Sequence, residues 1–346
     1  MRSATFVFVA SASATLIGCG GGSAHSATQV TADPPSATVA TVQARPSAAP
    51  VKVAITPGHG GADARPDRGV TIRATGGELT HISVRHGNET VAGTLNAAKT
   101  VWRTRWALAV SRKYTIVATA TGPSGKTTTG RRTIRTLTPR QTFAPRTIMA
   151  DHGTYGVGMP LIFYFDGPVK KRKAVERALE LKTSRPIVGS WYWDDTCGIV
   201  PTCLYFRPKR YWKPHTTVHF TAHVNGVRFG PGVFGDHDLS GTINIGRRLE
   251  VIASTTKHSM KLYKNHKQIA HWPISTGKPG DDTPNGTYLS IEKGNPVEMK
   301  GTGYDLSVPY SVRITWSGIY LHAAPWSVGA QGSSNVSHGC INLSPE

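Results

Sequence analysis

Hydrophobic and polar residues alternate in short runs over residues 51–138. Alternation with a period of two is typical of β-strands that bury one face. Turn signals such as Gly76-Gly77 and Gly122-Pro123-Ser124-Gly125 separate the runs. The expected strands are 51–55, 70–72, 81–84, 102–110 and 114–118. Short strands at this spacing predict an immunoglobulin-like (Ig-like) β-sandwich over residues 51–138.

A second β-rich segment follows over residues 139–244, and one stretch of it has a helical period. Within 169–182, the residues Val175, Ala178 and Leu179 share one side of a helix, and charged side chains take the other. The pattern predicts a helix over 169–182 inside a second Ig-like sandwich. Aromatic-rich runs in this segment favour core packing over a sugar-stacking platform. These runs are 191–193, 205–206 and 211–212.

From residue 245 to residue 346 the composition becomes that of a compact, strand-rich domain. The strand-like runs are 249–253, 260–263, 269–274, 287–291 and 311–316. The predicted fold class is therefore mainly β, with two Ig-like sandwiches followed by a third β-rich domain.

The N-terminus has the features of a secretion signal. Arg2 precedes an apolar run over 4–17, which is too short to span a bilayer and is typical of a signal-peptide core. Leu16-Ile17-Gly18-Cys19 resembles a bacterial lipobox, so we expect a lipid on Cys19 and attachment to the outer face of the cytoplasmic membrane. An ordinary signal peptide with no role for Cys19 is the alternative. Residues 20–50, rich in small residues and proline, are expected to form a disordered tether.

The net charge is +20, from 40 Lys and Arg against 20 Asp and Glu. A field of this sign favours an anionic partner. The cations are spread along the chain, and the dense run at 170–173 comes without a DNA- or RNA-binding signature. The pattern therefore disfavours nucleic acid and favours an acidic polymer of the cell envelope.

Cys197 and Cys203 lie in a loop with five residues between them. In an oxidising compartment they are free to form a disulfide, and two buried free thiols are the alternative. The spacing is not Cys-x-x-Cys and no histidine lies between them, which disfavours a metal site.

The remaining cysteine lies in Ser337-His338-Gly339-Cys340-Ile341-Asn342, eighteen residues after His322. A thiolate is a strong nucleophile, and a nearby imidazole can accept the proton of the thiol. Gly339 lets the backbone turn sharply beside the sulfur, so that main-chain N–H groups can point at a developing oxyanion. These residues predict nucleophilic acyl transfer.

Three motifs, in this order, carry a resemblance to a known family. They are Ser275-Thr276-Gly277, Thr283-Pro284-Asn285-Gly286, and His322 with 337–342. The C-terminal domain resembles the YkuD-type L,D-transpeptidase catalytic domain, and the whole chain is similar to lipoproteins of that family with two Ig-like domains.

The resemblance implies an enzyme that cross-links peptidoglycan without a cofactor. Such an enzyme attacks the carbonyl of the third residue of a tetrapeptide stem, releases D-alanine and holds a thioester. The acyl group then passes to an amine of a neighbouring stem, which gives a 3→3 cross-link. A carbapenem is expected to inhibit by acylating the same cysteine.

On this resemblance, Cys340 is the nucleophile and His322 is the general base. The backbone N–H groups of His338, Gly339 and Cys340 are candidates for the oxyanion hole, and the His338 side chain is expected to support the loop. Met299 and Tyr304 match positions on a flap over the donor site. The residues expected at the substrate site are Met299, Tyr304, Gly318, Trp326, Ser337 and Asn342, of which Asn342 is also expected to fix the loop.

Two positions depart from the family pattern. Ala323 stands where relatives often have Ser, and Trp316 where they often have Tyr. The backbone carbonyl of Ala323 can still accept a hydrogen bond from the general base and set its tautomer. A zinc site at His322, His338 and Cys340 is disfavoured, because no carboxylate or fourth ligand is evident.

Three alternatives stay open. Water as the acceptor would give an L,D-carboxypeptidase, and a protein amine would give attachment of a protein to the wall. Relatives continue past the cysteine motif with a further helix and strands, whereas this sequence ends at Glu346. The resemblance therefore also predicts an incomplete catalytic domain, and an inactive wall-binding remnant is the third alternative.

Overall fold

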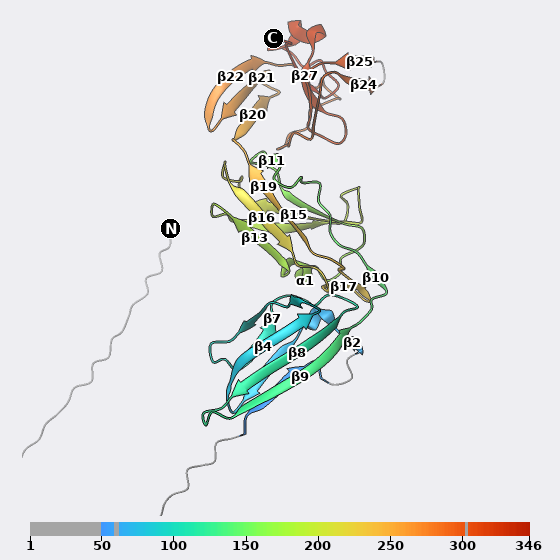
Figure 1. Cartoon of the computed structure of the whole chain (residues 1–346). Coiled ribbons are helices and arrows are strands. Elements are labelled where there is room, and N and C mark those ends of the chain that lie inside the picture. The colour runs from blue at the N-terminus through green and yellow to red at the C-terminus, as the bar shows by residue number, and fades with distance from the viewer. Residues whose placement is uncertain (1–49, 59–61, 302–303) are drawn as a thin grey trace, which may run out of the picture. The chain divides into compact units, whose positions relative to one another are not determined.

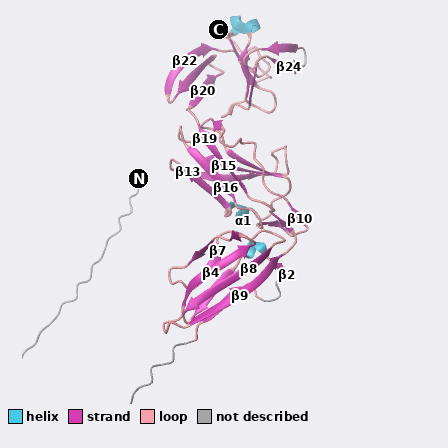
Figure 2. Cartoon of the chain, in the orientation of Figure 1, coloured by secondary structure: helices cyan, strands magenta, loops and turns pink. Residues whose placement is uncertain are grey.

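The computed structural model describes residues 50–58, 62–301 and 304–346. The predictions for the signal sequence, for Cys19 and for residues 20–49 lie outside these residues. The described part consists mainly of strands with a few short helical turns (Figure 2). Within it, no helix is both long enough and apolar enough to cross a bilayer.

The first group of strands forms two sheets, in the orders β1-β3-β7-β6 and β2-β9-β8-β4-β5 (Figure 1). Alternate residues of both sheets, such as Ile72, Ile116 and Ile134, fill one shared core. The predicted Ig-like sandwich is therefore confirmed in this segment. The bounds are β1 Lys52–Thr56, β2 Ala62–Ala64, η1 Pro66–Arg68, β3 Thr71–Thr75, β4 Glu78–His86, β5 Glu89–Thr90, β6 Gly93–Leu95, β7 Val101–Thr104, β8 Lys113–Thr121 and β9 Thr127–Thr136.

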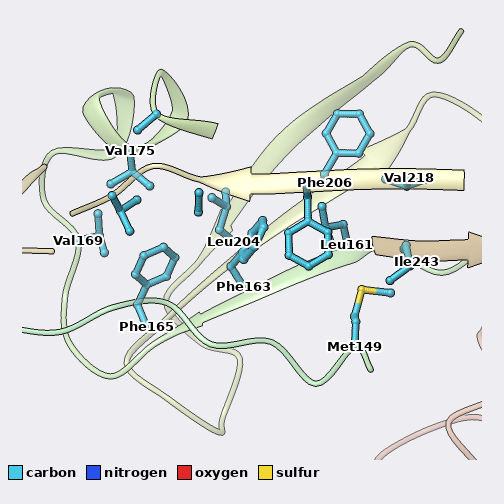
Figure 3. Packing of buried hydrophobic residues seen from close by; sticks show 14 of the residues in the cluster. Met149, Leu161, Phe163, Phe165, Val169, Val175, Leu204, Phe206, Val218 and Ile243 are labelled. Carbon is cyan, nitrogen blue, oxygen red and sulfur yellow. The ribbon is translucent and has the colours of Figure 1, made fainter. Parts of the chain in front are cut away.

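The second group has three sheets, in the orders β10-β18-β17, β11-β19-β16-β13 and β12-β15-β14. Its core includes Phe163 and Phe165 from β12 and Leu204 from β15 (Figure 3). The bounds are β10 Gln141–Thr142, β11 Thr154–Tyr155, β12 Leu161–Phe165, α1 Arg172–Glu176, β13 Leu179–Thr183, β14 Gly189–Asp194, β15 Thr202–Pro208, β16 Thr217–Ala222, β17 Arg228–Gly230, β18 Val233–Phe234 and β19 Leu239–Ile245.

The helix predicted over 169–182 is wrong in length. Only α1 is helical, and β13 begins three residues after α1 ends. All five residues of β13 pair with β16, from Leu179 opposite Ala222 to Thr183 opposite Val218. Pairing with a distant strand therefore overrides the local helical period. Val175 on α1 and Ala178 in the turn that follows α1 are both buried in the core.

The aromatic runs of the second group mostly pack into its core, as predicted. Trp191 and Trp193 of β14 lie against the buried cluster, and Trp212 is almost fully buried. Tyr192, which points to the other face of β14, is exposed. Cys203 on β15 is joined to Cys197 by a disulfide that closes the loop between β14 and β15.

The third group comprises sheets in the orders β20-β21-β22, β23-β26-β27-β28 and β24-β25. A small core around Met260, Ile274 and Ile341 lies within it. The bounds are β20 Leu249–Ser254, β21 Ser259–Lys264, β22 Lys267–Pro273, β23 Glu292–Gly294, β24 Val297–Gly301, β25 Tyr304–Val308, β26 Ser311–Arg313, β27 Tyr320–Ala323, η2 Pro325–Ala330 and β28 Ile341–Leu343.

Two predicted strands of this group differ from the structure. Residues 287–291 form a loop, in which the Tyr288 hydroxyl donates to the carbonyl of Pro284 at 2.9 Å. The strand predicted over 311–316 ends at Arg313, because its guanidinium donates to the carbonyls of Thr315 and Trp316 and the chain turns there. In the first group, likewise, the strand predicted over 102–110 ends at Thr104.

Candidate active site

The register of two parallel strands brings the predicted nucleophile and base together. On β27 and β28, His322 is opposite Asn342 and Leu321 is opposite Ile341. Leu321 and Ile341 pack into the core of the third group. Cys340 directly precedes β28. Extended by one residue, the register sets Cys340 opposite Tyr320, diagonally across from His322 and on the face away from Leu321 and Ile341. Apolar alternation therefore fixes the relative position of the two reactive groups.

A backbone carbonyl sets the tautomer of His322. The side chain is buried, and its Nδ1 lies 2.9 Å from the carbonyl oxygen of Ala323. Since a carbonyl can only accept, Nδ1 carries the proton and Nε2 is left as the basic nitrogen. The expectation that Ala323 keeps the carbonyl acceptor is confirmed. Burial lowers the pKa of His322 below its ordinary value of 6.5, and the bond to Ala323 opposes this only in part.

Burial acts on Cys340 in the opposite direction. It raises the pKa of the thiol above its ordinary value of 9.0, against a smaller lowering by a backbone hydrogen bond from Tyr320. The sulfur lies 3.9 Å from the carbonyl oxygen of Gly318. Both shifts favour the uncharged pair, a thiol beside an imidazole. The geometry therefore supports a base that takes the proton as the sulfur attacks.

Ser337 closes the loop of residues 337–340, which we call the Cys loop. Its hydroxyl donates to the carbonyl of Cys340 at 2.7 Å and accepts from the N–H of Gly339 at 3.1 Å. Gly339 has φ +115°, a conformation that favours glycine. Because the Gly339 N–H is bonded, the N–H groups of His338 and Cys340 are the remaining candidates for an oxyanion hole.

The two shorter motifs hold the Cys loop from the outside. The Thr283 hydroxyl donates to the carbonyl of Gly339 at 2.8 Å and accepts from the N–H of Gly277 at 3.0 Å. The side-chain oxygen of Asn335, just before the loop, accepts from the N–H and the hydroxyl of Thr276 at 3.1 and 2.8 Å. Sequence reasoning identified both motifs and gave these side chains no role.

The side chain of His338 lies between a cation and an aromatic ring. The Nζ of Lys278 is 3.1 Å from its Nε2, and the ring of Tyr304 is 5.3 Å away between centroids. An ammonium can only donate, so this nitrogen of His338 carries no proton. Lys278 also lies 3.4 Å from Asp281. This geometry fits loop support and not a second base. Lys278 was missed, although it directly follows the first motif.

The residues expected at the substrate site come from several elements. The exposed Trp326 of η2 has its ring 5.9 Å from that of His322. Gly318, at φ +96°, offers its carbonyl to the sulfur. Met299 on β24 and Tyr304 on β25 belong to one antiparallel pair of strands, and Tyr304 reaches the Cys loop through His338.

The side chains of Ser337 and Asn342 are buried, and Asn342 makes the kind of hydrogen bonds expected of a residue that fixes the loop. The two residues are only 7% and 3% exposed, so their side chains do not line a substrate site. The Asn342 amide donates to the Ser327 hydroxyl of η2 at 3.1 Å, and its backbone pairs with Ser275. Both residues therefore support the Cys loop and the strand that follows it.

A polar pocket of about 680 Å³ adjoins this network without including Cys340 or His322. Its lining residues are Thr255, Thr256, His258, Gly277, Asp282, Thr283, Pro284, Asn285 and Asn335. Among the described residues, no cluster of three or more His, Cys, Asp or Glu side chains could hold a metal ion.

Comparisons with known proteins agree with this geometry. Residues 61–228 match the bacterial Ig domain family, and residues 248–346 match the L,D-transpeptidase catalytic domain. The chain is 33% identical to L,D-transpeptidase 2 of Mycobacterium tuberculosis over 291 residues, which cover 81% of this chain and 70% of the relative. It is 32% identical to L,D-transpeptidase 5 of the same species, and the match covers 87% of this chain and 68% of that relative. A solved L,D-transpeptidase in complex with imipenem aligns at 34% identity over 60% and 91% of the two chains, with a TM-score of 0.49.

Proposed function

The chain belongs to the L,D-transpeptidase family, and from this premise we propose that it cross-links peptidoglycan through a thioester on Cys340. The donor is a tetrapeptide stem, the acceptor is an amine of a neighbouring stem, and the product is a 3→3 link. The observation that carries the proposal is the position of Cys340, directly before β28, diagonally across from His322 on β27, with Nδ1 of His322 bonded to Ala323.

The first half-reaction forms the thioester. Nε2 of His322 takes the thiol proton as Sγ of Cys340 attacks the carbonyl carbon of the third stem residue. The negative charge on the carbonyl oxygen is stabilised by the N–H groups of His338 and Cys340. The C–N bond to D-alanine then breaks, and the imidazolium returns the proton to the leaving amine.

The second half-reaction runs the same steps in reverse order with a new amine. The acceptor amine loses a proton to Nε2 of His322 as it attacks the thioester carbonyl. The C–S bond breaks, the new amide forms, and the imidazolium gives the proton back to the sulfur. The tautomer fixed by Ala323 serves both halves, because the same nitrogen accepts and donates.

The change Cys340→Ala tests the proposal in a strain that lacks other enzymes of this family. Muropeptide mass spectrometry should show 3→3 dimers with the parent chain and none with the variant, because the variant has no nucleophile. Ser334→Ala, an exposed change near the loop, is the matched control and should keep the dimers. Dimers that persist in the Cys340→Ala strain would refute the thioester.

The identity of the acceptor is tested with the purified chain and a tetrapeptide stem. We expect a cross-linked dimer with release of D-alanine when an amine acceptor is present. Release of D-alanine with only a tripeptide product, whether or not an amine is added, would instead assign an L,D-carboxypeptidase. A product joined to a protein amine would assign protein attachment.

We also propose that a carbapenem acylates Cys340. A solved relative is a complex with imipenem, and a β-lactam carbonyl presents the same electrophile as the donor amide. The sulfur would bond to that carbonyl while the ring C–N bond opens and its nitrogen takes the proton from His322. Intact-protein mass spectrometry should show a gain equal to the whole drug, absent in Cys340→Ala.

For the envelope location, we propose a lipid on Cys19, supported by Leu16-Ile17-Gly18-Cys19. A chain with Cys19→Ala should leave the membrane fraction, whereas Ser23→Ala, four residues further on, should stay with it. Membrane retention of the Cys19→Ala chain would overturn this proposal and leave the transpeptidase proposal untouched.

A further inference from the structure

One face of the first Ig-like sandwich carries cations and hydroxyls in register. On the sheet β2-β9-β8-β4-β5, Lys113 is opposite Arg135, and Val117 is opposite Arg131. Thr115 lies opposite both Thr133 and Arg85. Cross-strand partners point to the same side of a sheet, so these residues share one face. We call it the basic sheet face. Its exposed members are Glu78, His81, Arg85, Thr90, Lys113, Thr115, Thr127, Thr129, Arg131, Thr133 and Arg135.

Charge is concentrated in this part of the chain. Residues 51–138 contain 14 Lys and Arg against four Asp and Glu, a net charge of +10. That is half of the net charge of the whole chain in about a quarter of its residues. Lys113 and Arg135 even lie directly opposite each other, an arrangement of like charges that destabilises a sheet. The fold itself gains nothing from this pair.

The nearby carboxylates do not neutralise the face. Glu78 pairs with Lys99 at 3.6 Å, and Asp67 pairs with Arg65. Glu89 is opposite His86, and therefore points to the other side of the sheet from Arg85. Within the described residues, the four cations of the basic sheet face make no salt bridge, so they are available to an external anion.

The hydroxyls narrow the class of ligand. On this face, β8 has Lys113, three threonines and Val117, and β9 has two arginines among threonines. Thr119 and Thr129 already bond to each other at 2.9 Å. Hydroxyl rows beside cations suit a chain that carries both hydroxyls and negative charges. Among its described residues, the face has one exposed ring, the imidazole of His81 opposite Thr119, while Tyr114 of β8 is buried. It therefore has no exposed Phe, Tyr or Trp of the kind on which nucleobases stack.

From this charge complementarity we propose that the basic sheet face binds a linear anionic polysaccharide of the cell envelope. The cations contact its carboxylates or phosphates, and the threonines contact its hydroxyls. The surface lies outside the catalytic domain, so binding does not depend on the transpeptidase chemistry. It would hold the chain along a polymer while the Cys loop works on stem peptides.

Binding is measured by fluorescence anisotropy with the full chain and labelled polygalacturonate. Four changes together, Arg85→Gln, Lys113→Gln, Arg131→Gln and Arg135→Gln, should weaken binding by about tenfold or more, since four exposed ion pairs of modest strength are lost. The control changes four other exposed cations of the same sandwich to Gln. These are Lys52, Arg73, Arg103 and Lys126. It should weaken binding less than about threefold.

Further arms separate the other outcomes. Fully methyl-esterified polygalacturonate should not bind, because the carboxylates are blocked. The double change Thr115→Val and Thr133→Val keeps the net charge. It should weaken the binding of polygalacturonate and leave the binding of single-stranded DNA unchanged. Equal losses in both four-cation variants would overturn the proposal in favour of general charge attraction. Tighter binding of single-stranded DNA or of phosphatidylglycerol vesicles than of polygalacturonate would overturn it in favour of those partners.

Discussion

At the scale of single residues, the site rests uncharged. Burial pushes the pKa of Cys340 up and that of His322 down, so neither group is ionised near neutral pH. Deprotonation of the thiol must therefore accompany attack on the donor carbonyl. The bond from His322 to Ala323 makes this efficient, because Nε2 is held as the acceptor before the substrate arrives.

The pH dependence of acylation follows from these shifts. His322 must be neutral to accept the proton, and its lowered pKa means that it is protonated only below its ordinary value of 6.5. The rate of Cys340 acylation by imipenem should therefore be flat at neutral pH and fall on the acid side with a midpoint below 6.5. It should change again only above pH 9.0, where the thiol ionises.

The pH profile is obtained by following acylation by imipenem with stopped-flow absorbance from pH 4 to pH 10 and plotting the apparent rate constant at each pH. His322→Gln is the control, and it should be slow and lack the acid limb because no titrating base remains. An acid midpoint at or above 6.5 would contradict the neutral resting pair.

At the scale of elements, three segments distant in sequence build one loop. The Cys loop is closed by its own Ser337, braced by Thr283 and positioned by Asn335 next to Thr276. Hydrogen bonds to backbone groups fix a loop more sharply than side-chain packing, because their geometry is directional. The brace from Thr283 is thus a positioning contact, because it holds the peptide group that joins Gly339 to Cys340.

Replacing Thr283 with valine tests this brace. Thr283→Val keeps the shape of the side chain and leaves the carbonyl of Gly339 and the N–H of Gly277 without their partner. We expect imipenem acylation to slow by about ten- to a hundredfold, since small misplacements of a catalytic group are costly. Stability should fall by about 1–3 kcal/mol.

Thr283→Ser serves as the conservative control and should acylate within about threefold of the parent, because it keeps the hydroxyl. A valine variant that acylates like the parent would show that the loop holds its shape without the brace.

Sequence alone predicted the parts of the site that are contiguous. Cys340, Gly339 and Ser337 lie in one short run, and His322 precedes Cys340 by eighteen residues in the order that the family resemblance implies. Lys278 and the role of Thr283 could not be predicted, because they depend on a hydrogen bond across about 60 residues. The same reason explains the helix predicted over 169–182, since the pairing of β13 with β16 is not visible in the local period.

At the scale of the whole molecule, each group of strands has a hydrophobic core of its own. Ile116 belongs to the first, Leu204 to the second and Ile341 to the third. The cores do not share residues, so a defect in one need not reach the chemistry in another.

The change Leu204→Ala should destabilise the second group alone. Leu204 is fully buried, and a cavity of this kind costs about 2–5 kcal/mol. Differential scanning calorimetry should show one transition moving to lower temperature, while acylation of Cys340 at 25 °C stays unchanged. Ile148→Ala, at a 61% exposed position, should shift stability by less than about 0.5 kcal/mol. Loss of acylation with Leu204→Ala would contradict the independence of the cores.

The raised pKa of Cys340 also bears on the lifetime of the enzyme. The chain carries a disulfide between Cys197 and Cys203, which implies surroundings that oxidise thiols. Peroxide and disulfide exchange act on thiolates, and a thiol kept protonated reacts slowly with both. In the proposed mechanism, the burial that keeps the Cys340 thiol protonated until a donor is attacked would therefore also slow its oxidation between turnovers.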